Sequence, residues 1–323
     1  MLKKIISQDC IRMKNPFQPT VNIIILNYNG RDLVAECLPS IIEASHVSKY
    51  SCKVTVIDNV STDDSVSFLR LNFPDVDVVK AKENLVLCSY NDVLRFIEDD
   101  IVILLNNDIK VRNDFVDPLI EPFREEDVFL TSPKSYFFDG RYEGGRSYSF
   151  MKYGMFGTDH YFKEDCEEAD KKSYTFASGY GAFDRGKFLE LGGYDDLYLP
   201  GRLEDADLCF RAWKRGYKCY YQPESVVYHK GAESFKDNFG VNGTLVITFR
   251  NVFLFMWKNI SSPLFLLEHI VLLFPRLIFA CLRGQTGFVY GFLKAIPLLP
   301  RALKKRNIDN RLLKDRDIFK IVG

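Results

Sequence analysis

The chain has 323 residues, and its 43 Lys plus Arg balance its 43 Asp plus Glu, so the formal net charge is zero. This balance removes any overall electrostatic argument for nucleic-acid binding. The length suits one large domain with an appendage, or two domains. The eight cysteines are scattered and never spaced C-x-x-C, which argues against a zinc site or a redox dithiol and favours a reduced, cytoplasmic chain.

The amino-terminal segment, residues 1–15, carries charges but no apolar core followed by small residues. Such a core defines a signal peptide. We therefore expect the amino-terminal part of the chain to stay in the cytoplasm.

Apolar runs rich in β-branched residues alternate with helical patterns over the first 110 residues, separated by turn and capping residues. The predicted elements are strands over residues 21–26, 53–57, 77–80 and 101–105, and helices over residues 31–44, 65–71 and 90–98. This alternation predicts an α/β fold, in which a mainly parallel sheet is flanked by helices.

Polar side chains follow three of the predicted strands. They are Asn27, Tyr28 and Asn29, then Asp58 and Asn59, then Asn106, Asn107 and Asp108. Ligands of such sheets bind beyond the carboxyl ends of the strands, where these groups are expected to meet. An isolated Asp108 would most simply stabilise a turn. Two amides and a carboxylate together, however, supply the hard oxygen ligands that Mg²⁺ or Mn²⁺ prefers, with phosphates completing the shell.

The middle of the chain is harder to interpret. Residues 129–143 are aromatic and rich in turn residues, and residues 144–172 are predicted to be irregular, with an acidic cluster over 164–170. This stretch suits either a loop over the site or a solvated excursion. Regular structure is expected again over residues 175–183. A helix is predicted over 205–215, and Gly216 is predicted to end it.

Three acidic residues lie at the start of that helix: Glu204, Asp205 and Asp207. One carboxylate would be enough to cap the helix, so a second role as a general base is open to them. His229 follows a pair of β-branched residues. It is either structural or, at the end of a strand facing the carboxylates, a metal ligand through its neutral imidazole.

The composition changes after about Gly240. Residues 245–257 and 263–282 are strongly apolar, but Glu268, His269, Pro275 and Arg276 interrupt the second run, which argues against a spanning helix. Apolar faces beside the basic residues near 301–306 suggest helices that lie on an anionic membrane surface. Packing on the first domain, or a dimer contact, is the alternative.

Seven motifs in order carry a family resemblance: NIIILNYNG, VIDNVSTDDS, ENLVLCSYN, ILLNND, SGYGAFDRGKFLELGGYDD, EDADLCFRAWKRGYK and VVYHKGAES. Together they resemble the family 2 nucleotide-sugar glycosyltransferases of the GT-A fold, and most closely the rhamnosyltransferase-like branch that builds bacterial surface polysaccharides. The resemblance runs from about residue 21 to residue 235. It suggests a GT-A catalytic domain over residues 1–240 and a C-terminal helical, membrane-associating region over residues 241–323.

For the donor, the resemblance implies that Asp58 contacts the pyrimidine base and that Asn27, Tyr28 and Asn59 line its pocket. It places Asn106 and Asn107 near the ribose or diphosphate.

For the chemistry, it implies that Asp108 is the principal ligand of a divalent cation (Mn²⁺ or Mg²⁺), that His229 completes the metal site, and that Asp205 is the catalytic base beside Glu204. Two residues depart from the family pattern: Val86 replaces a Gly, and Asn106 replaces the first acid of the metal motif.

The predicted function is an inverting transfer of a sugar, with rhamnose the first candidate, from a nucleoside-diphosphate donor to a hydroxyl of a saccharide or lipid-linked saccharide. The enzyme would be cytoplasmic and peripheral on the inner face of the plasma membrane. Two alternatives stay open: a catalytically weak, membrane-associated carbohydrate-binding or assembly protein of the same fold, and a sugar nucleotidyltransferase. The second would need a basic, Gly-rich loop for a triphosphate, and the segment NYNGRDLV offers only Arg31.

Overall fold

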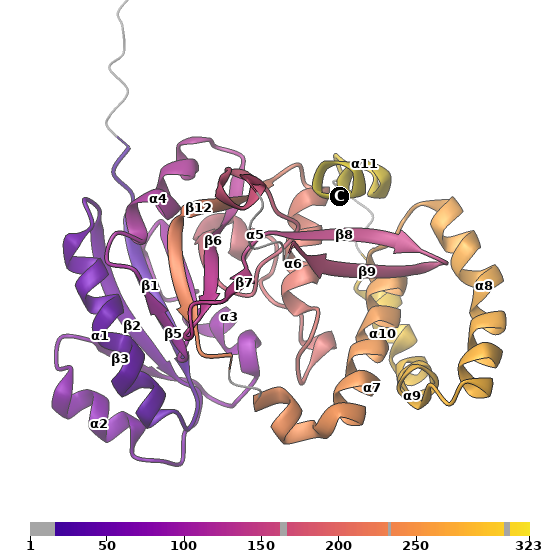
Figure 1. Cartoon of the computed structure of the whole chain (residues 1–323), viewed down its shortest axis with the longest axis horizontal. Helices are drawn as coiled ribbons and strands as arrows, with labels where there is room; N and C mark the ends of the chain where they lie inside the picture. The colour runs from indigo at the N-terminus through magenta and orange to yellow at the C-terminus, as the bar shows by residue number, and fades with distance from the viewer. Residues whose placement is uncertain (1–16, 162–166, 232–233, 307–310) are drawn as a thin grey trace, which may run out of the picture.

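The computed structural model describes residues 17–161, 167–231, 234–306 and 311–323 (Figure 1). Residues 1–15, expected to contain no signal peptide, and the start of the acidic cluster at 164–170 lie outside these ranges.

A mixed, mainly parallel sheet forms the centre of the α/β part (Figure 1). Its strand order is β10-β12-β6-β11-β4-β1-β2-β3, with β5 paired to β12 and β7 to β6. The strands are β1 (Thr20–Asn27), β2 (Ser51–Asp58), β3 (Asp77–Lys80), β4 (Ile101–Asn106), β5 (Ile109–Val111), β6 (Val128–Phe137), β7 (Tyr142–Gly144), β10 (Ser173–Tyr174), β11 (Gly181–Asp184) and β12 (Lys218–His229).

Strand direction brings the predicted site to one edge. β1, β2, β3 and β4 are mutually parallel, and Asn27 lies opposite Asp58 in the register. β11 is antiparallel to both β4 and β6, whereas β12 is parallel to β6. β12 therefore runs in the same direction as β4, and His229, its last residue, emerges at the same edge as Asp108.

Helices cover both faces of the sheet because successive strand residues point to opposite sides. Ile23 and Ile25 of β1 belong to one buried cluster, and Ile24 between them belongs to the other. The helices of this part are α1 (Arg31–Val47), α2 (Ser65–Asn72), α3 (Ser89–Val93), α4 (Val116–Ile120), α5 (Arg185–Glu190) and α6 (Glu204–Lys214). The predicted fold class is confirmed.

Two predicted segments are wrong. The helix expected over residues 90–98 is confined to α3, and Phe96 beyond it is 83% exposed, so its apolar ring is not part of a helical core face. The stretch predicted to be irregular contains a hairpin of β8 (Ser147–Lys152) and β9 (Met155–His160). Tyr153 and Gly154 form its two-residue turn, and both have the positive φ that such turns require.

Five helices follow the sheet: α7 (Ser234–Asn259, interrupted at Gly240), α8 (Pro263–Leu282), α9 (Thr286–Ala295), α10 (Leu299–Lys304) and α11 (Asp315–Val322). α7 packs into the first part of the chain, since the Phe255 ring stacks on Phe156 of β9 at 3.9 Å between centroids. The alternative that the C-terminal region packs on the first domain therefore holds for α7. The domain division at residue 240 stays a prediction.

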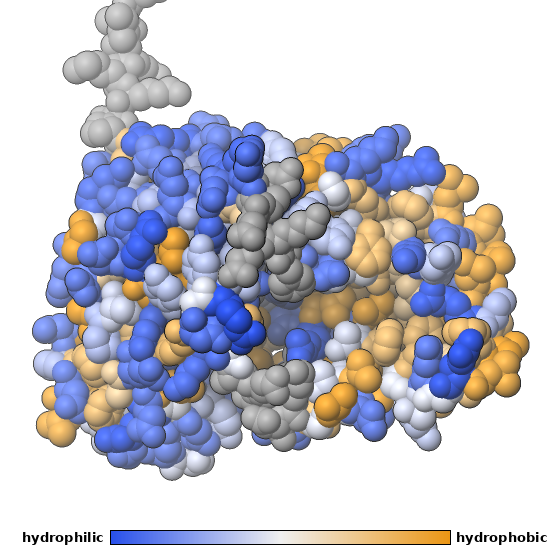
Figure 2. Space-filling model, viewed as in Figure 1, coloured by the Kyte–Doolittle hydropathy of each residue, from blue (hydrophilic) through white to orange (hydrophobic). Residues whose placement is uncertain are grey.

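α8 is different, because most of its apolar side chains face outward. Residues 264, 267, 270, 271, 274, 278, 279 and 282 are each more than half exposed, and Figure 2 shows apolar surface gathered at the end of the molecule where Figure 1 places α8. By length and composition alone, two helical segments, Asn238–Asn259 and Pro263–Leu282, would suffice to cross a membrane. Such helices are weak evidence, and much of the first is buried.

Candidate active site

Hydrogen bonds connect the polar ends of the parallel strands. The Asn107 Nδ2 group donates to Asn27 Oδ1 at 2.8 Å, which joins the ends of β4 and β1. Asn59 donates through Nδ2 to Asn84 Oδ1 at 2.8 Å and accepts from the Ser89 hydroxyl at 2.6 Å. Asn106, the last residue of β4, is half-buried beside them. The Asn59 backbone N–H also donates to the Asn27 carbonyl oxygen at 2.7 Å, so these strand ends form one connected, largely buried polar network.

Asp58 is almost completely buried at the end of β2, with 1% of its surface exposed. Its Oδ1 atom accepts from the Ser61 backbone N–H at 3.1 Å, but Oδ2 has no hydrogen-bond partner in the described part of the chain. A buried, unsatisfied carboxylate oxygen is costly. An N–H donor from a ligand would satisfy it. Tyr28, half exposed nearby, is open to a ligand.

Asp108 and His229 meet at the predicted metal position. His229 Nε2 lies 3.3 Å from Asp108 Oδ2, and Nδ1 on the other side of the ring lies 2.7 Å from Glu143 Oε1. Burial favours the neutral imidazole, but the hydrogen bonds with Asp108 and Glu143 outweigh it and raise the pKa of His229 to about 10. The His229 ring is therefore protonated on both nitrogens and lies between two carboxylates.

This donor set fits a divalent cation in part. Two neighbouring ligands of an octahedral cation lie about 3 Å apart, which is close to the observed Asp108–His229 separation. Glu143 on the far ring nitrogen is the kind of carboxylate that orients metal-binding histidines. The described residues contain no group of three or more His, Cys, Asp or Glu side chains arranged to hold a metal. Further ligands would have to come from the phosphates of a donor.

The predicted catalytic pair begins α6. Glu204 is 8% exposed, and its Oε2 atom lacks a partner among the described residues. Burial, followed by the negative charge of Asp205, raises the pKa of Glu204 to about 8. Burial also raises the pKa of Asp205, whose Oδ1 accepts from the Ala206 N–H at 2.8 Å. Burial therefore raises the pKa of both adjacent acids.

One segment of the chain, Gly179–Tyr180, approaches both the catalytic pair and the metal position. A Cβ atom placed on Gly179 would lie 3.7 Å from Asp205 Oδ2. The next residue, Tyr180, places its ring centroid 5.9 Å from that of His229, and its hydroxyl lies 3.4 Å from Glu143. The Gly179–Tyr180 segment thus lies near both groups, and their convergence in one site stays a prediction.

The structure changes the set of site residues that the sequence suggested. Asp207, the third acidic residue at the start of the helix, is fully buried in ion pairs with Arg211 and Lys258. Two further sets of residues were not predicted. Glu143 was overlooked because it lies in a turn-rich stretch with no motif. Asn84 and Ser89 lie in the motif ENLVLCSYN, but only the fold shows that they contact Asn59.

The raised pKa of Glu204 leads to a stability prediction. Its pKa rises from 4.5 to about 8 on folding, so the folded state holds the proton more tightly, and stability falls as pH rises through this window. We expect Glu204→Gln to be more stable than the wild type above pH 8, by on the order of 2–4 kcal/mol, with the difference vanishing near pH 4.5. Chemical denaturation at several pH values measures it.

The matched control is Glu190→Gln, because the Glu190 carboxylate is half exposed and pairs with Arg215 at 2.9 Å. This variant should gain nothing at high pH. A Glu204→Gln chain whose stability followed the wild type at every pH would show that Glu204 ionises normally.

Comparison with known proteins identifies the class. The sequence model described as glycosyl transferase family 2 matches residues 22–191, more than half of the chain, so the chain belongs to this family. A comparison with curated protein sequences gave no match.

Solved structures of glycosyltransferases share the fold. GalNAc-T7 with UDP, GalNAc and Mn²⁺ is 17% identical with a TM-score of 0.56, over 74% of this chain and 48% of that one. A mannosyltransferase from Pyrobaculum calidifontis, in complex with GDP-Man and Mn²⁺, is 16% identical with a TM-score of 0.52, over 90% and 74%. S. aureus TarS 1-349 is 14% identical with a TM-score of 0.54, over 88% and 81%. This chain therefore spans about half of the first of these. The GT-A fold is confirmed; the rhamnosyltransferase-like branch stays a prediction.

Proposed function

We propose that the chain is an inverting glycosyltransferase that moves a sugar from a nucleoside-diphosphate donor to a hydroxyl of a saccharide or lipid-linked saccharide, in the assembly of a surface polysaccharide. The proposal is supported by the contact between His229 and Asp108 at 3.3 Å and by the Gly179–Tyr180 segment, which approaches both His229 and Asp205, in a chain of family 2. Rhamnose is the first candidate sugar, by resemblance alone.

In this mechanism, the nucleotide lies across the carboxyl ends of β1, β2 and β4. The unpartnered Oδ2 of Asp58 accepts an N–H of the base, and the amides of Asn106 and Asn107 face the ribose or diphosphate. Asp205 takes the proton of the acceptor hydroxyl. The oxygen of that hydroxyl attacks the anomeric carbon on the face opposite the nucleotide, and the nucleoside diphosphate leaves. Positive charge grows on the sugar, as in glycoside hydrolysis.

Glu204 has a separate role, because its pKa of about 8 keeps it protonated at neutral pH. Asp205 would then be the member of the pair that takes the acceptor proton, as the family resemblance implies. Asp108 and His229 would hold a divalent cation, which supplies charge neutralisation for the departing diphosphate. Such binding requires the His229 ring to lose a proton, and Glu143 then accepts the remaining N–H.

Donor screening tests the proposal. Thermal-shift measurements with nucleotide sugars, with and without Mn²⁺, should single out one donor, and slow release of nucleoside diphosphate should follow in its presence. Stabilisation without any turnover would favour the catalytically weak carbohydrate-binding alternative. A chain that no nucleotide sugar stabilises would overturn the proposal.

We further propose that the outward face of α8 lies on an anionic membrane surface, where a lipid-linked acceptor would be found. Ile270 and Phe274 are 64% and 70% exposed on this face, and Arg283, the residue after α8, offers positive charge at its end. We expect the double variant Ile270→Asp, Phe274→Asp to lose most of its sedimentation with vesicles that contain anionic lipid.

The control is Phe96→Asp, because Phe96 is 83% exposed on α/β surface remote from α8 in the chain. It should sediment as the wild type does. Deleting the whole tail is a poorer test, since Asp315 and Ile318 of α11 are buried in the fold. Full sedimentation of the α8 variant would place any membrane contact elsewhere.

A further inference from the structure

The turn that leads into the catalytic pair has an unfavourable backbone. Arg202 and Leu203 precede Glu204 directly, and their φ angles are 76° and 68°. The left-handed region costs a non-glycine residue on the order of 1–2 kcal/mol, and strained residues persist only where their surroundings fix them. Something outside this turn must therefore hold it in place.

A single side chain from the C-terminal region contacts the turn at three points. Asn251 of α7 is fully buried. Its Nδ2 atom lies 2.9 Å from the Tyr198 carbonyl oxygen and 2.8 Å from those of Gly201 and Arg202. One amide group thus contacts three backbone carbonyl oxygens of the segment 195–203, which we call the loop and which ends in this turn. One of the three belongs to Arg202, whose φ is positive.

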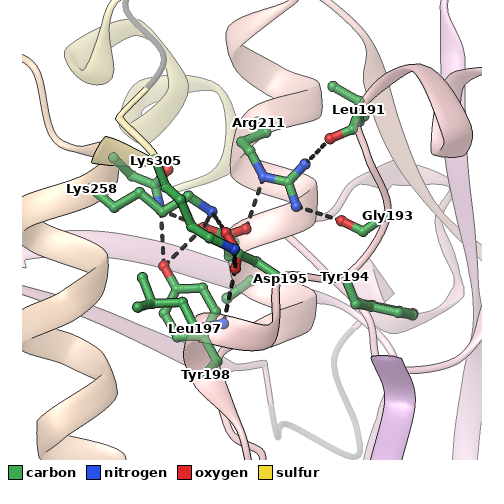
Figure 3. A network of polar contacts seen from close by, with 12 residues as sticks. Leu191, Gly193, Tyr194, Asp195, Leu197, Tyr198, Arg211, Lys258 and Lys305 are labelled. Atoms are coloured by element: carbon green, nitrogen blue, oxygen red, sulfur yellow. Dashed lines mark hydrogen bonds and ion pairs between the residues drawn. The ribbon is translucent and has the colours of Figure 1, made fainter. Parts of the chain in front are cut away.

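The start of the loop is held to α7 as well (Figure 3). Lys258 lies with Nζ 2.6 Å from Asp195 Oδ2 and 2.6 Å from Asp207 Oδ1. The Tyr198 hydroxyl donates to the same Asp207 oxygen at 2.8 Å. Because Asp207 belongs to α6, Lys258 connects the loop, the catalytic helix and α7 at one point.

The loop also forms a wall of a small cavity beside Glu204. Tyr198, Leu199 and Gly201 line this cavity together with Glu204 and Val86. Val86 has a φ of 52°, a strained angle for a β-branched residue. A shift of the loop would therefore move the cavity wall and the carboxyl groups together.

From these contacts we infer that Asn251 is a positioning residue for the transfer reaction, which holds the turn at 201–203 so that Glu204 and Asp205 face the donor. This inference rests on the proposed function. Asn251 is assigned no contact with the substrate, because its amide contacts the three carbonyl oxygens. It acts through these carbonyl groups, so α7 would help to position the catalytic pair.

Two variants test the inference. Asn251→Ala removes the donor, and Asn251→Asp keeps the shape but turns an oxygen toward three carbonyl oxygens. With the donor chosen by screening, we expect kcat to fall about 10- to 100-fold, because a displacement of about 1 Å can cost 10²-fold. The KM for the donor should change less than about threefold, because the nucleotide is held at the strand ends. Hydrogen exchange of the amides at 196–203 should accelerate in both variants.

Thr248→Ala is the matched control. Thr248 lies in the same helix, and its hydroxyl donates to the Thr244 carbonyl oxygen at 2.9 Å, within the helix. In this variant kcat should stay within about threefold and loop exchange should stay near the wild-type rate.

The outcomes separate the two proposals. Unchanged loop exchange in both Asn251 variants would show that Asn251 does not hold the turn. Faster loop exchange with wild-type kcat would show that the turn does not position the catalytic pair. Either result overturns the inference. A wild-type chain that turns over no donor would instead overturn the proposed function, and the exchange measurement would still decide whether Asn251 holds the loop.

Discussion

Replacing Asp205 with Asn is expected to lower turnover by about 100- to 10,000-fold, the usual contribution of a positioned general base. The amide has the same shape as the carboxylate and still accepts the Ala206 N–H, so the start of α6 should keep its conformation. What is lost is the capacity to take a proton from the acceptor hydroxyl. Donor affinity should change little, because the nucleotide would lie at the strand ends.

Initial rates of nucleoside-diphosphate release, together with donor titration by calorimetry, measure the two effects separately. Asp196→Asn is the matched control, since Asp196 is a half-exposed carboxylate in the same part of the chain that pairs with Arg301 at 2.7 Å. It should keep near-normal turnover. If Asp205→Asn turned over at the wild-type rate, Asp205 would have no part in proton transfer.

The α/β fold was predictable because its signals are local. β-branched runs ended at turn residues, and the predicted strand over 77–80 coincides with β3. The predicted helices over 31–44 and 65–71 lie within α1 and α2, because their apolar residues recur with helical spacing. Because β1, β2 and β4 are parallel, their last residues, Asn27, Asp58 and Asn106, lie at the same edge of the sheet.

The errors arose where long-range packing decides the structure. The β8–β9 hairpin turns at Tyr153-Gly154, which lacks the Asn-Gly or Asp-Gly signal of such turns. Its apolar residues are buried by parts of the chain distant in sequence: Phe156 stacks on Phe255, about 100 residues later in the chain. No window of local sequence contains that contact.

The candidate site was predictable only in part for the same reason. Asp108 and His229 were expected to meet, and they do, at 3.3 Å. Their metal-binding role stays a prediction. Glu143, which contacts the other side of His229, has no sequence motif. Asn251 lies in the strongly apolar run 245–257, and nothing in that run predicts a role for it. Its contacts with three carbonyl oxygens are seen only in the folded structure.

The second large effect is expected for Asp108→Ala, which should weaken metal and nucleotide binding together because a cation would bridge protein and phosphate. Loss of an orienting carboxylate beyond the ligands typically costs 10- to 100-fold in metal affinity, so loss of a direct ligand should cost more than about 100-fold. Mn²⁺ would then no longer raise nucleoside-diphosphate affinity. Calorimetric titration of the nucleotide, with and without Mn²⁺, measures this coupling.

Asp114→Ala is the control for this prediction, since Asp114 is an exposed carboxylate on the same segment that pairs with Arg112. It should keep the full Mn²⁺ effect, because surface ion pairs contribute little to the fold and none to the site. The coupling distinguishes a metal role for Asp108 from a structural one: a merely destabilised variant would bind less nucleotide but keep the ratio of affinities with and without Mn²⁺. A wild-type chain that binds nucleotide equally well with and without Mn²⁺ would contradict the metal role of both Asp108 and His229.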